Sequence, residues 1–232
     1  MNIPVSSLGV AYDYKEILPS KDSIDFFAER FEGSPSDTKR IEQVLVRWLF
    51  TRSSAKDLLY TALGLNDNPI LKFEISKPFS EREFDVLSWN RGAPHEAVAV
   101  ECKRAKIKKE SFLNDDVTGL HKLSEGVIQS DKLLEVGFFK TYLLIMTVVD
   151  GRERTMYNQL SRVANKVQLD RIFDFPNRDE LHKDVGIIFV EIVQTTDAPL
   201  SHTGFIYVSI AQSPTPQTQK RKITEKIGLL LN

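Results

Sequence analysis

Three charged residues in two neighbouring runs of strand-forming residues have the types and the spacing to do chemistry together. Asp85 lies in the run EFDVLSW, and fifteen residues separate it from Glu101, which is followed by Cys102 and Lys103. Side chains alternate across a strand, so Glu101 and Lys103 share one face while Cys102 occupies the other. If the two runs pair antiparallel through the turn NRGAP, Asp85 lies beside Glu101. We therefore expect two carboxylates and one ammonium to converge.

Two carboxylates held this close repel each other unless a cation lies between them. Mg²⁺ or Mn²⁺ suits such a site, because a hard divalent ion takes oxygen ligands and keeps several waters. The metal lowers the pKa of a bound water and neutralises charge on phosphoryl oxygens. Lys103 would orient the attacking water or stabilise the transition state. The pattern therefore indicates metal-dependent hydrolysis of a phosphate ester.

The residue pattern before Asp150 predicts the elements that must position these side chains. We expect a helix over Ser20–Phe31, a helix from about Asp37 to Leu63, strands over Ile70–Ser76, Glu83–Trp89 and Glu96–Lys103, a helix over about Val117–Leu134 stopped by Gly137, and a buried strand over Phe138–Val149. The order is helix, three-strand meander, helix, strand. This order indicates the α/β class.

Beyond Asp150 the pattern predicts a helix near Arg154–Leu169 and two strands, over 185–195 and 204–212, that pair as a hairpin. The proline-rich stretch SPTPQTQKRK reads as a mobile tail before a short segment that docks back. No repeat or second domain is evident, so we expect a single domain with a core over about 37–149 and a C-terminal extension over about 150–232.

This arrangement resembles the PD-(D/E)XK nucleases, whose signature is an acid on one strand and acid-x-lysine on the next. Asp85 matches the first acid, and Glu101, Cys102 and Lys103 match the second element, while Phe84 stands in place of the name-giving proline. The resemblance covers roughly 37–149 and implies a restriction-endonuclease-like core. It also implies a nuclease that uses Mg²⁺ or Mn²⁺, with Asp85, Glu101 and Lys103 catalytic.

The resemblance extends to residues on the two flanking helices. Family members often supply a helical glutamate to the metal site, and Glu42 is the matching candidate, although a solvated acid near a helix N-terminus is an equal reading. One branch places a glutamine followed four residues later by a tyrosine on the second helix. Gln129 matches the glutamine, but Leu133 stands in place of the tyrosine. Gln129 and Lys132 are thus candidate substrate contacts, or simply part of a solvent-exposed polar face of the helix.

Basic residues gather locally although the whole chain is nearly neutral. There are 31 Lys and Arg against 32 Asp and Glu, so no global charge favours a non-specific nucleic-acid binder. The run KRAKIKK begins at the proposed catalytic lysine, Lys103, and reads as a basic loop. Lys106, Lys108 and Lys109 in this loop are therefore candidate phosphate contacts.

Composition also bears on where the protein resides and what it binds. No apolar run is long enough for a membrane span, the N-terminus does not resemble a signal peptide, and the single cysteine fits a reducing compartment, so we expect a cytoplasmic protein. The expected partner is nucleic acid, DNA rather than RNA. A homodimer, with an interface on the C-terminal strand pair, or a protein partner would supply specificity.

Two other functions compete with the nuclease. A non-catalytic module that binds nucleic acid or a protein on the same scaffold would carry vestigial acids, because fold does not dictate function. The complete set of Asp85, Glu101 and Lys103 argues against it. A transferase or lyase that acts on a small phosphate ester lacks a nucleotide-binding loop.

Overall fold

The computed structural model describes residues 7–13, 41–51, 55–76, 79, 83–151, 164–194 and 203–230. The strands are β1 (Ser7–Asp13), β2 (Ile70–Ile75), β3 (Phe84–Trp89), β4 (Val98–Ile107), β5 (Lys140–Asp150), β6 (Gly186–Gln194) and β7 (Thr203–Gln212). The α-helices are α1 (Ile41–Thr51), α2 (Lys56–Leu63), α3 (Leu120–Val136), α4 (Lys166–Phe173) and α5 (Arg221–Leu229). Short 3₁₀ turns are η2 (Pro94–Glu96), η3 (Lys109–Phe112) and η4 (Arg178–Glu180). The expected helix over Ser20–Phe31 lies outside the described residues.

The strands form one seven-stranded mixed sheet in the order β1-β7-β6-β5-β4-β3-β2. Strands β2, β3 and β4 form the expected antiparallel meander, β4, β5 and β6 run parallel, and β6, β7 and β1 run antiparallel. The α/β class and the pairing of the two C-terminal strands are thereby confirmed. The C-terminal strands continue the same sheet, and β1 occupies the outer edge of β7, so this strand pair does not offer its free edge to a second copy.

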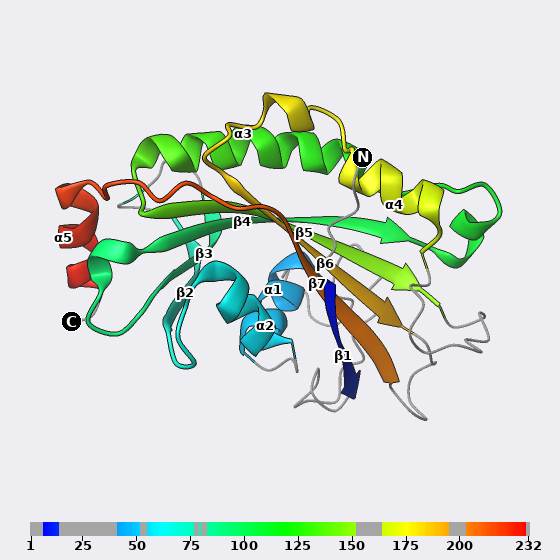
Figure 1. Ribbon diagram of the computed structural model, residues 1–232, viewed down its shortest axis with the longest axis horizontal. Coiled ribbons are helices and arrows are strands. Elements are labelled where there is room, and N and C mark those ends of the chain that lie inside the picture. The colour runs from blue at the N-terminus through cyan, green and yellow to red at the C-terminus, as the bar shows by residue number, and fades with distance from the viewer. Residues whose placement is uncertain are drawn as a thin grey trace, which may run out of the picture.

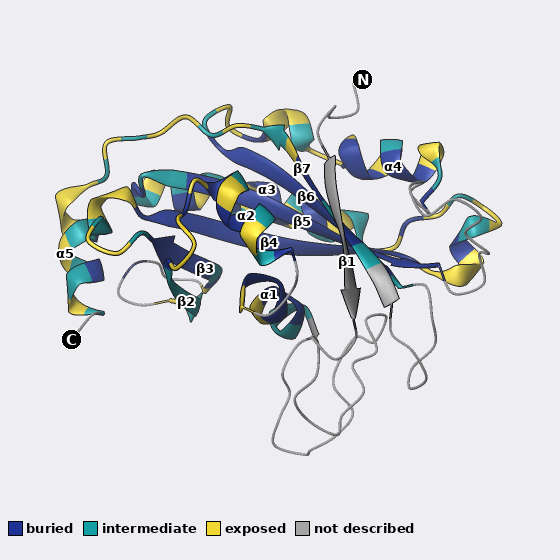
Figure 2. Cartoon of the chain, turned by 60° about the horizontal axis from the view of Figure 1, so that its bottom comes forward, coloured by how far each residue is buried: buried dark blue, intermediate teal, exposed yellow. Residues whose placement is uncertain are grey.

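Helices cover both faces of the sheet. Figure 1 shows α3 and α4 on one side and α1 and α2 on the other, with α5 beside η2 at one end. The central strands are buried on both faces, as their continuous dark blue colour in Figure 2 shows. Buried apolar side chains of even-numbered β4 positions pack towards α1 and α2, and Ala105 and Ile107 pack towards α3 and α4. The sheet thus separates two cores.

Helix boundaries agree with the prediction in part. Gly137 ends α3 with a left-handed φ of 96°, the conformation that favours glycine at this position. The single helix expected from about Asp37 to Leu63 is two helices instead. The hydroxyl of Tyr60 in α2 donates to the carbonyl oxygen of Phe50 in α1, so a side chain satisfies a carbonyl that a continuous helix would have used.

The prediction of a loop between Lys103 and Lys109 was wrong. Strand β4 continues to Ile107, because β5 provides a parallel partner along this whole length. Lys106 also exchanges two backbone hydrogen bonds of 2.9 Å with Thr118 on its other side. A basic composition therefore does not prevent strand pairing here, since the neighbouring strand determines it.

The prediction of a mobile tail was also wrong. Residues 213–220, which we call the strap, run along the end of the sheet and hydrogen bond to other segments. The amide of Gln217 donates to the carbonyl oxygen of Phe139 at 2.8 Å, and the amide of Lys220 donates to that of Gly137 at 3.1 Å. Prolines fix φ at two positions of the strap, and the amides of Thr215, Gln217 and Lys220 find partners in the folded domain.

The strap ends in α5, which docks as expected. The side chain of Gln219 accepts from the amide of Ala97 at 3.0 Å and donates to the carbonyl oxygen of Pro94 at 2.8 Å, so it fixes the start of β4. Helix α5 closes an apolar cluster at this end of the sheet, which we call the end cluster and which comprises Phe79, Phe84, Leu87, Trp89, Ala97, Ala99, Leu133, Phe138, Ile223 and Ile227.

Candidate functional site

The predicted site lies where β3 separates from β4. The antiparallel register pairs Val86 with Val100, and the described ladder ends there, one position before Asp85 and Glu101. Beyond this point the carboxylate oxygen Oδ2 of Asp85 accepts a hydrogen bond of 2.7 Å from the amide of Cys102. A side chain thus replaces the next backbone acceptor of the ladder. Asp85 lies beside the Glu101 segment, as the turn length predicted.

Glu101 and Lys103 point to the same face of β4 and contact each other. Nζ of Lys103 lies 2.5 Å from Oε1 of Glu101, and only 4% of the glutamate side chain and 11% of the lysine side chain are exposed. Cys102 is fully buried in the core on the opposite face. The alternation expected from the sequence is therefore confirmed for these three residues. A buried pair of this kind is fixed by its geometry, because neither group has water to replace its partner.

The two carboxylates are electrostatically unfavourable as they stand. The pKa of Asp85 is raised to about 8, mainly by burial and secondly by repulsion from Glu101. Lys103 and the amide of Cys102 act in the opposite direction. Burial also raises the pKa of Glu101, and the attraction of Lys103 offsets only part of this effect. Protonation relieves the repulsion, and a cation would relieve it equally well. The site therefore favours an additional positive charge.

Lys103 remains a positively charged ammonium beside the two carboxylates. Burial alone would lower its pKa, but attraction from Glu101 and Asp85 outweighs burial and raises it. A lysine with a raised pKa does not serve as a general base near neutral pH. Its role in any chemistry is to hold a positive charge and to donate hydrogen bonds.

Glu42 approaches the site from α1. Its charge contributes to the raised pKa of both Asp85 and Glu101, so it lies close enough to act on the site electrostatically. Helix α1 is tied to the start of β3 by a hydrogen bond of 3.3 Å from Gln43 Nε2 to Glu83 Oε1. Within the described ranges, no three His, Cys, Asp or Glu side chains are grouped closely enough to hold a metal ion. Direct ligation by Glu42 therefore stays a prediction.

Helix α3 covers the site from the face that carries Glu101 and Lys103. Gln129 is partly buried, and its Oε1 atom has no hydrogen-bond partner among the described residues, which is unusual for a buried amide oxygen. Lys132 is exposed on the same helix. Sequence reasoning missed Gly126, which packs on the stem of Lys103; a glycine within a helical pattern was the signal that could have found it.

The three lysines proposed as phosphate contacts do not form one group. Lys106 is only 4% exposed, so it cannot track a phosphate backbone at the surface, and this part of the prediction was wrong. It is buried because it lies within β4, between β5 and the segment at Thr118. Lys108 and Lys109 follow the end of the strand and are exposed. Only these two remain available to solvent.

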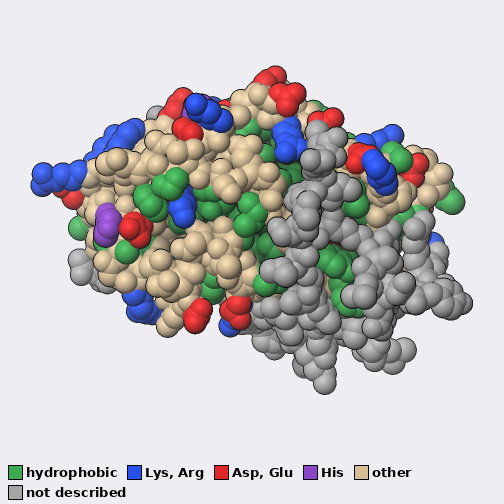
Figure 3. Space-filling model, viewed as in Figure 1, with side chains coloured by type: hydrophobic (Ala, Val, Ile, Leu, Met, Phe, Trp, Pro, Cys, Tyr) green, Lys and Arg blue, Asp and Glu red, His purple; other side chains and the backbone are tan. Residues whose placement is uncertain are grey.

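The surface around these elements carries mixed charges. On the face shown in Figure 3, Lys and Arg side chains are interspersed with Asp and Glu among the described residues. This agrees with a net charge of −1. A polyanion would therefore be held by a few local contacts rather than by a broad positive field.

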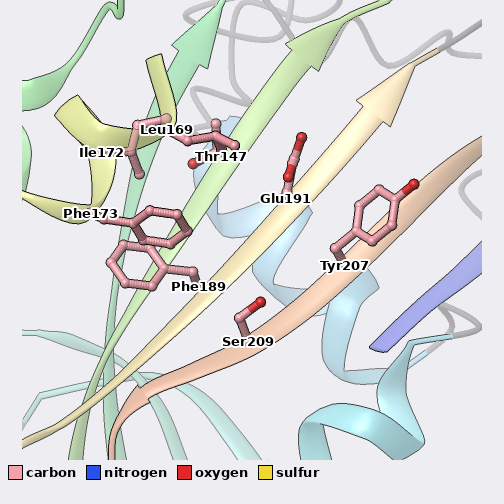
Figure 4. A pocket seen from close by; sticks show the side chains of 8 residues that line it. All are labelled: Thr147, Leu169, Ile172, Phe173, Phe189, Glu191, Tyr207 and Ser209. Atoms are coloured by element: carbon pink, nitrogen blue, oxygen red, sulfur yellow. The ribbon is translucent and has the colours of Figure 1, made fainter. Parts of the chain in front are cut away.

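A separate pocket lies on the same face of the sheet, under α4. Figure 4 shows its lining, which consists of Thr147, Leu169, Ile172, Phe173, Phe189, Glu191, Tyr207 and Ser209. The volume open to the centre of a water molecule is about 10 Å³, enough for roughly one water. None of the predicted site residues lines it. The pocket is therefore too small to hold a substrate.

No protein-family model, curated protein or solved structure matches the chain. Within the described ranges, none of the helices has the length and apolarity that a membrane crossing requires.

Proposed function

We propose that the protein is a divalent-metal-dependent nuclease of the PD-(D/E)XK type that hydrolyses phosphodiester bonds, with DNA as the expected substrate. The observation that carries this proposal is the placement of Asp85, Glu101 and Lys103 on one face at the point where β3 leaves β4. The order of α1, the β2-β3-β4 meander, α3 and a β5 parallel to β4 supports a restriction-endonuclease-like core.

The residues fit a hard divalent cation. Asp85 uses Oδ2 for the amide of Cys102, and Glu101 uses Oε1 for Lys103, so each carboxylate keeps a second oxygen for a metal. Two carboxylates with raised pKa values gain most from an added positive charge. Mg²⁺ is commonly held by one or two carboxylates together with waters and substrate phosphates. Asp85 and Glu101 would hold it, and Glu42 would act through a bound water.

The chain's own residues have separable tasks in this chemistry. A bound Mg²⁺ supplies a Lewis acid and a water with a lowered pKa. The amide of Cys102 fixes the orientation of the Asp85 carboxylate. Lys103 holds its ammonium beside Glu101, where it stabilises negative charge on the phosphoryl oxygens in the transition state. Gln129 offers a buried amide for a hydrogen bond with water or substrate.

A non-catalytic binding module remains the second candidate, because one observation favours it. The short contact between Lys103 and Glu101 gives each of these two charged groups a partner without a metal. In this alternative, Asp85 serves only as the hydrogen-bond acceptor for the amide of Cys102 in β4. Activity, rather than binding, separates the two candidates.

The decisive experiment incubates the protein with end-labelled single- and double-stranded DNA and RNA in the presence of Mg²⁺, Mn²⁺, Ca²⁺ or EDTA. We expect cleavage with Mg²⁺ or Mn²⁺, binding without turnover in Ca²⁺, and no cleavage in EDTA. Asp85→Asn and Glu101→Gln should both abolish cleavage, because each removes a charged ligand with little change in volume. Cleavage that survives EDTA or both substitutions would place the reaction elsewhere.

A further inference from the structure

Gly126 lies in the middle of α3, where glycine is unfavourable for a helix. It belongs to the buried stripe of this helix, with Leu123, Val127 and Ser130. Helix α3 makes most of its sheet contacts with β4, which carries Glu101 and Lys103, and with the neighbouring strand β5. A residue of low helix propensity at a buried position calls for a packing reason.

The packing reason is the stem of Lys103. A Cβ atom built on Gly126 would lie 2.7 Å from Cγ of Lys103 and 2.8 Å from Cδ1 of Leu143. Both distances are shorter than side-chain contacts allow, so one of the two neighbours would have to move. Leu143 is the β5 partner of Glu101 in the parallel ladder. Gly126 therefore opens a notch in α3 directly over the Glu101 and Lys103 pair.

The displaced atom of Lys103 is close to its backbone, which amplifies the effect. Cγ is the second carbon of the side chain, and three further bonds connect it to Nζ. A change of rotamer that moves Cγ away from the helix would carry Nζ out of its 2.5 Å contact with Glu101. Leu143 is fully buried and cannot retreat freely into the core.

We propose that Gly126 is a positioning residue, whose missing side chain lets the Lys103 stem pass beneath α3 and holds its ammonium against Glu101. The inference rests on the proposed function only where it concerns the rate of cleavage. The placement of Lys103 is a separate, measurable property of the folded protein. In the nuclease, Gly126 acts through Lys103 and does not touch the substrate.

The chain offers a matched control in Gly228 of α5. An added Cβ at Gly228 would meet nothing within 4 Å. Gly126→Ala and Gly228→Ala therefore introduce the same methyl group into a helix, and only the first introduces it beside Lys103. Both replace a helical glycine with alanine and so gain helix propensity.

The experiment measures lysine accessibility and kinetics on these variants. Only 11% of the Lys103 side chain is exposed, so brief acetylation followed by peptide mass spectrometry should find it protected in the wild-type chain and in Gly228→Ala. Gly126→Ala should increase its labelling several-fold. With Mg²⁺ and labelled DNA, Gly126→Ala should lower kcat by about tenfold or more with little change in KM, because a transition-state contact is lost.

A double-mutant cycle shows whether the effect passes through Lys103. In a Lys103→Ala background the clash with Cγ is absent and only the contact with Leu143 remains, so Gly126→Ala should cause little further loss of kcat. If Gly126→Ala alone does not fold, the pair Gly126→Ala and Leu143→Ala, compared with Leu143→Ala, removes the second clash and keeps the first.

The outcomes separate the two proposals. Increased labelling of Lys103 in a protein that cleaves no nucleic acid would support the positioning role and overturn the nuclease. Active Gly126→Ala with protected Lys103 and an unchanged kcat would overturn the positioning role and leave the nuclease standing.

Discussion

At the scale of single residues, neighbours on β4 have opposite surroundings. Lys103 lies beside Glu101 on the α3 face, while Cys102 is buried in the other core. Lys103→Met should lower the rate of cleavage by a factor on the order of 100 with the fold intact. Cys102→Ala should cost about 1 kcal/mol of unfolding free energy and leave the rate per folded molecule unchanged. Urea unfolding and single-turnover cleavage measure the two effects. The reverse pattern would mean that the face assignment is wrong.

The raised pKa of Asp85 predicts how stability depends on pH. The group holds its proton up to about pH 8 in the folded protein, whereas its ordinary value is 3.8. The folded state therefore binds more protons between these values, and unfolding free energy in EDTA should fall as pH rises from 4 to 8. The decrease should be on the order of a few kcal/mol, because each unit of pKa shift corresponds to about 1.4 kcal/mol.

Asp85→Asn tests this dependence directly. The amide oxygen can still accept from Cys102, so the backbone contact is kept while the charge is removed. Urea unfolding in EDTA at pH 5 and pH 8 should show a shallower loss of stability for this variant. In place of EDTA, Mg²⁺ should stabilise the wild-type chain at pH 8 but not Asp85→Asn. Glu125→Gln, at an exposed position on α3, should keep the wild-type dependence. Equal slopes in all three proteins would contradict the assignment.

At the scale of elements, strand periodicity and turn length predicted the features that depend on neighbouring residues in the sequence. The two-residue period of a strand placed Glu101 and Lys103 on one face, and the short NRGAP turn set the register that brings Asp85 to Glu101. Strand β1 was missed although Leu8, Val10 and Tyr12 alternate along it. That alternation was the available signal.

The remaining differences come from partners distant in sequence. The length of β4 depends on β5, and the order of the strap depends on carbonyl groups near Phe139 and Gly137. A single sequence does not state which segments meet, so a basic strand looked like a loop and an extended tail looked mobile. Lys106 was misassigned for the same reason.

The end of β4 provides a test of substrate contact. Lys108 and Lys109 are exposed just beyond the strand. Replacing both with alanine should weaken DNA binding and reduce the slope of log K against log salt by about 2, since each phosphate contact contributes roughly one unit. Fluorescence anisotropy in Ca²⁺ at several salt concentrations measures this slope.

A control lysine lies at the opposite end of the parallel strands. Lys183 is exposed before the start of β6, and β6 runs parallel to β4 through β5. Lys183→Ala should leave the salt slope unchanged. An unchanged slope for the Lys108 and Lys109 variant as well would return these residues to the role of an ordinary solvated surface.

At the scale of the whole molecule, α5 holds one end of the sheet together. Ile227 is fully buried in the end cluster, whereas Leu229 on the same helix is 72% exposed. Ile227→Ala should therefore lower the unfolding free energy by about 2–5 kcal/mol, and Leu229→Ala should change it by less than about 0.5 kcal/mol. Urea unfolding at fixed pH compares them. Similar small losses for both would mean that α5 contributes little to the fold.

The strap and α5 also set an order of maturation during translation. Residues 213–230 are synthesised after all seven strands. They nevertheless supply the acceptor for the Ala97 amide and two members of the end cluster, Ile223 and Ile227. Until they emerge from the ribosome, Leu87, Ala99 and Leu133 lack part of their apolar cover. This is the kind of exposed surface that attracts chaperones and promotes misassembly in partly synthesised chains. The end of the sheet that carries Ala97 and Ala99 is consequently completed only after the strap and α5 have been made.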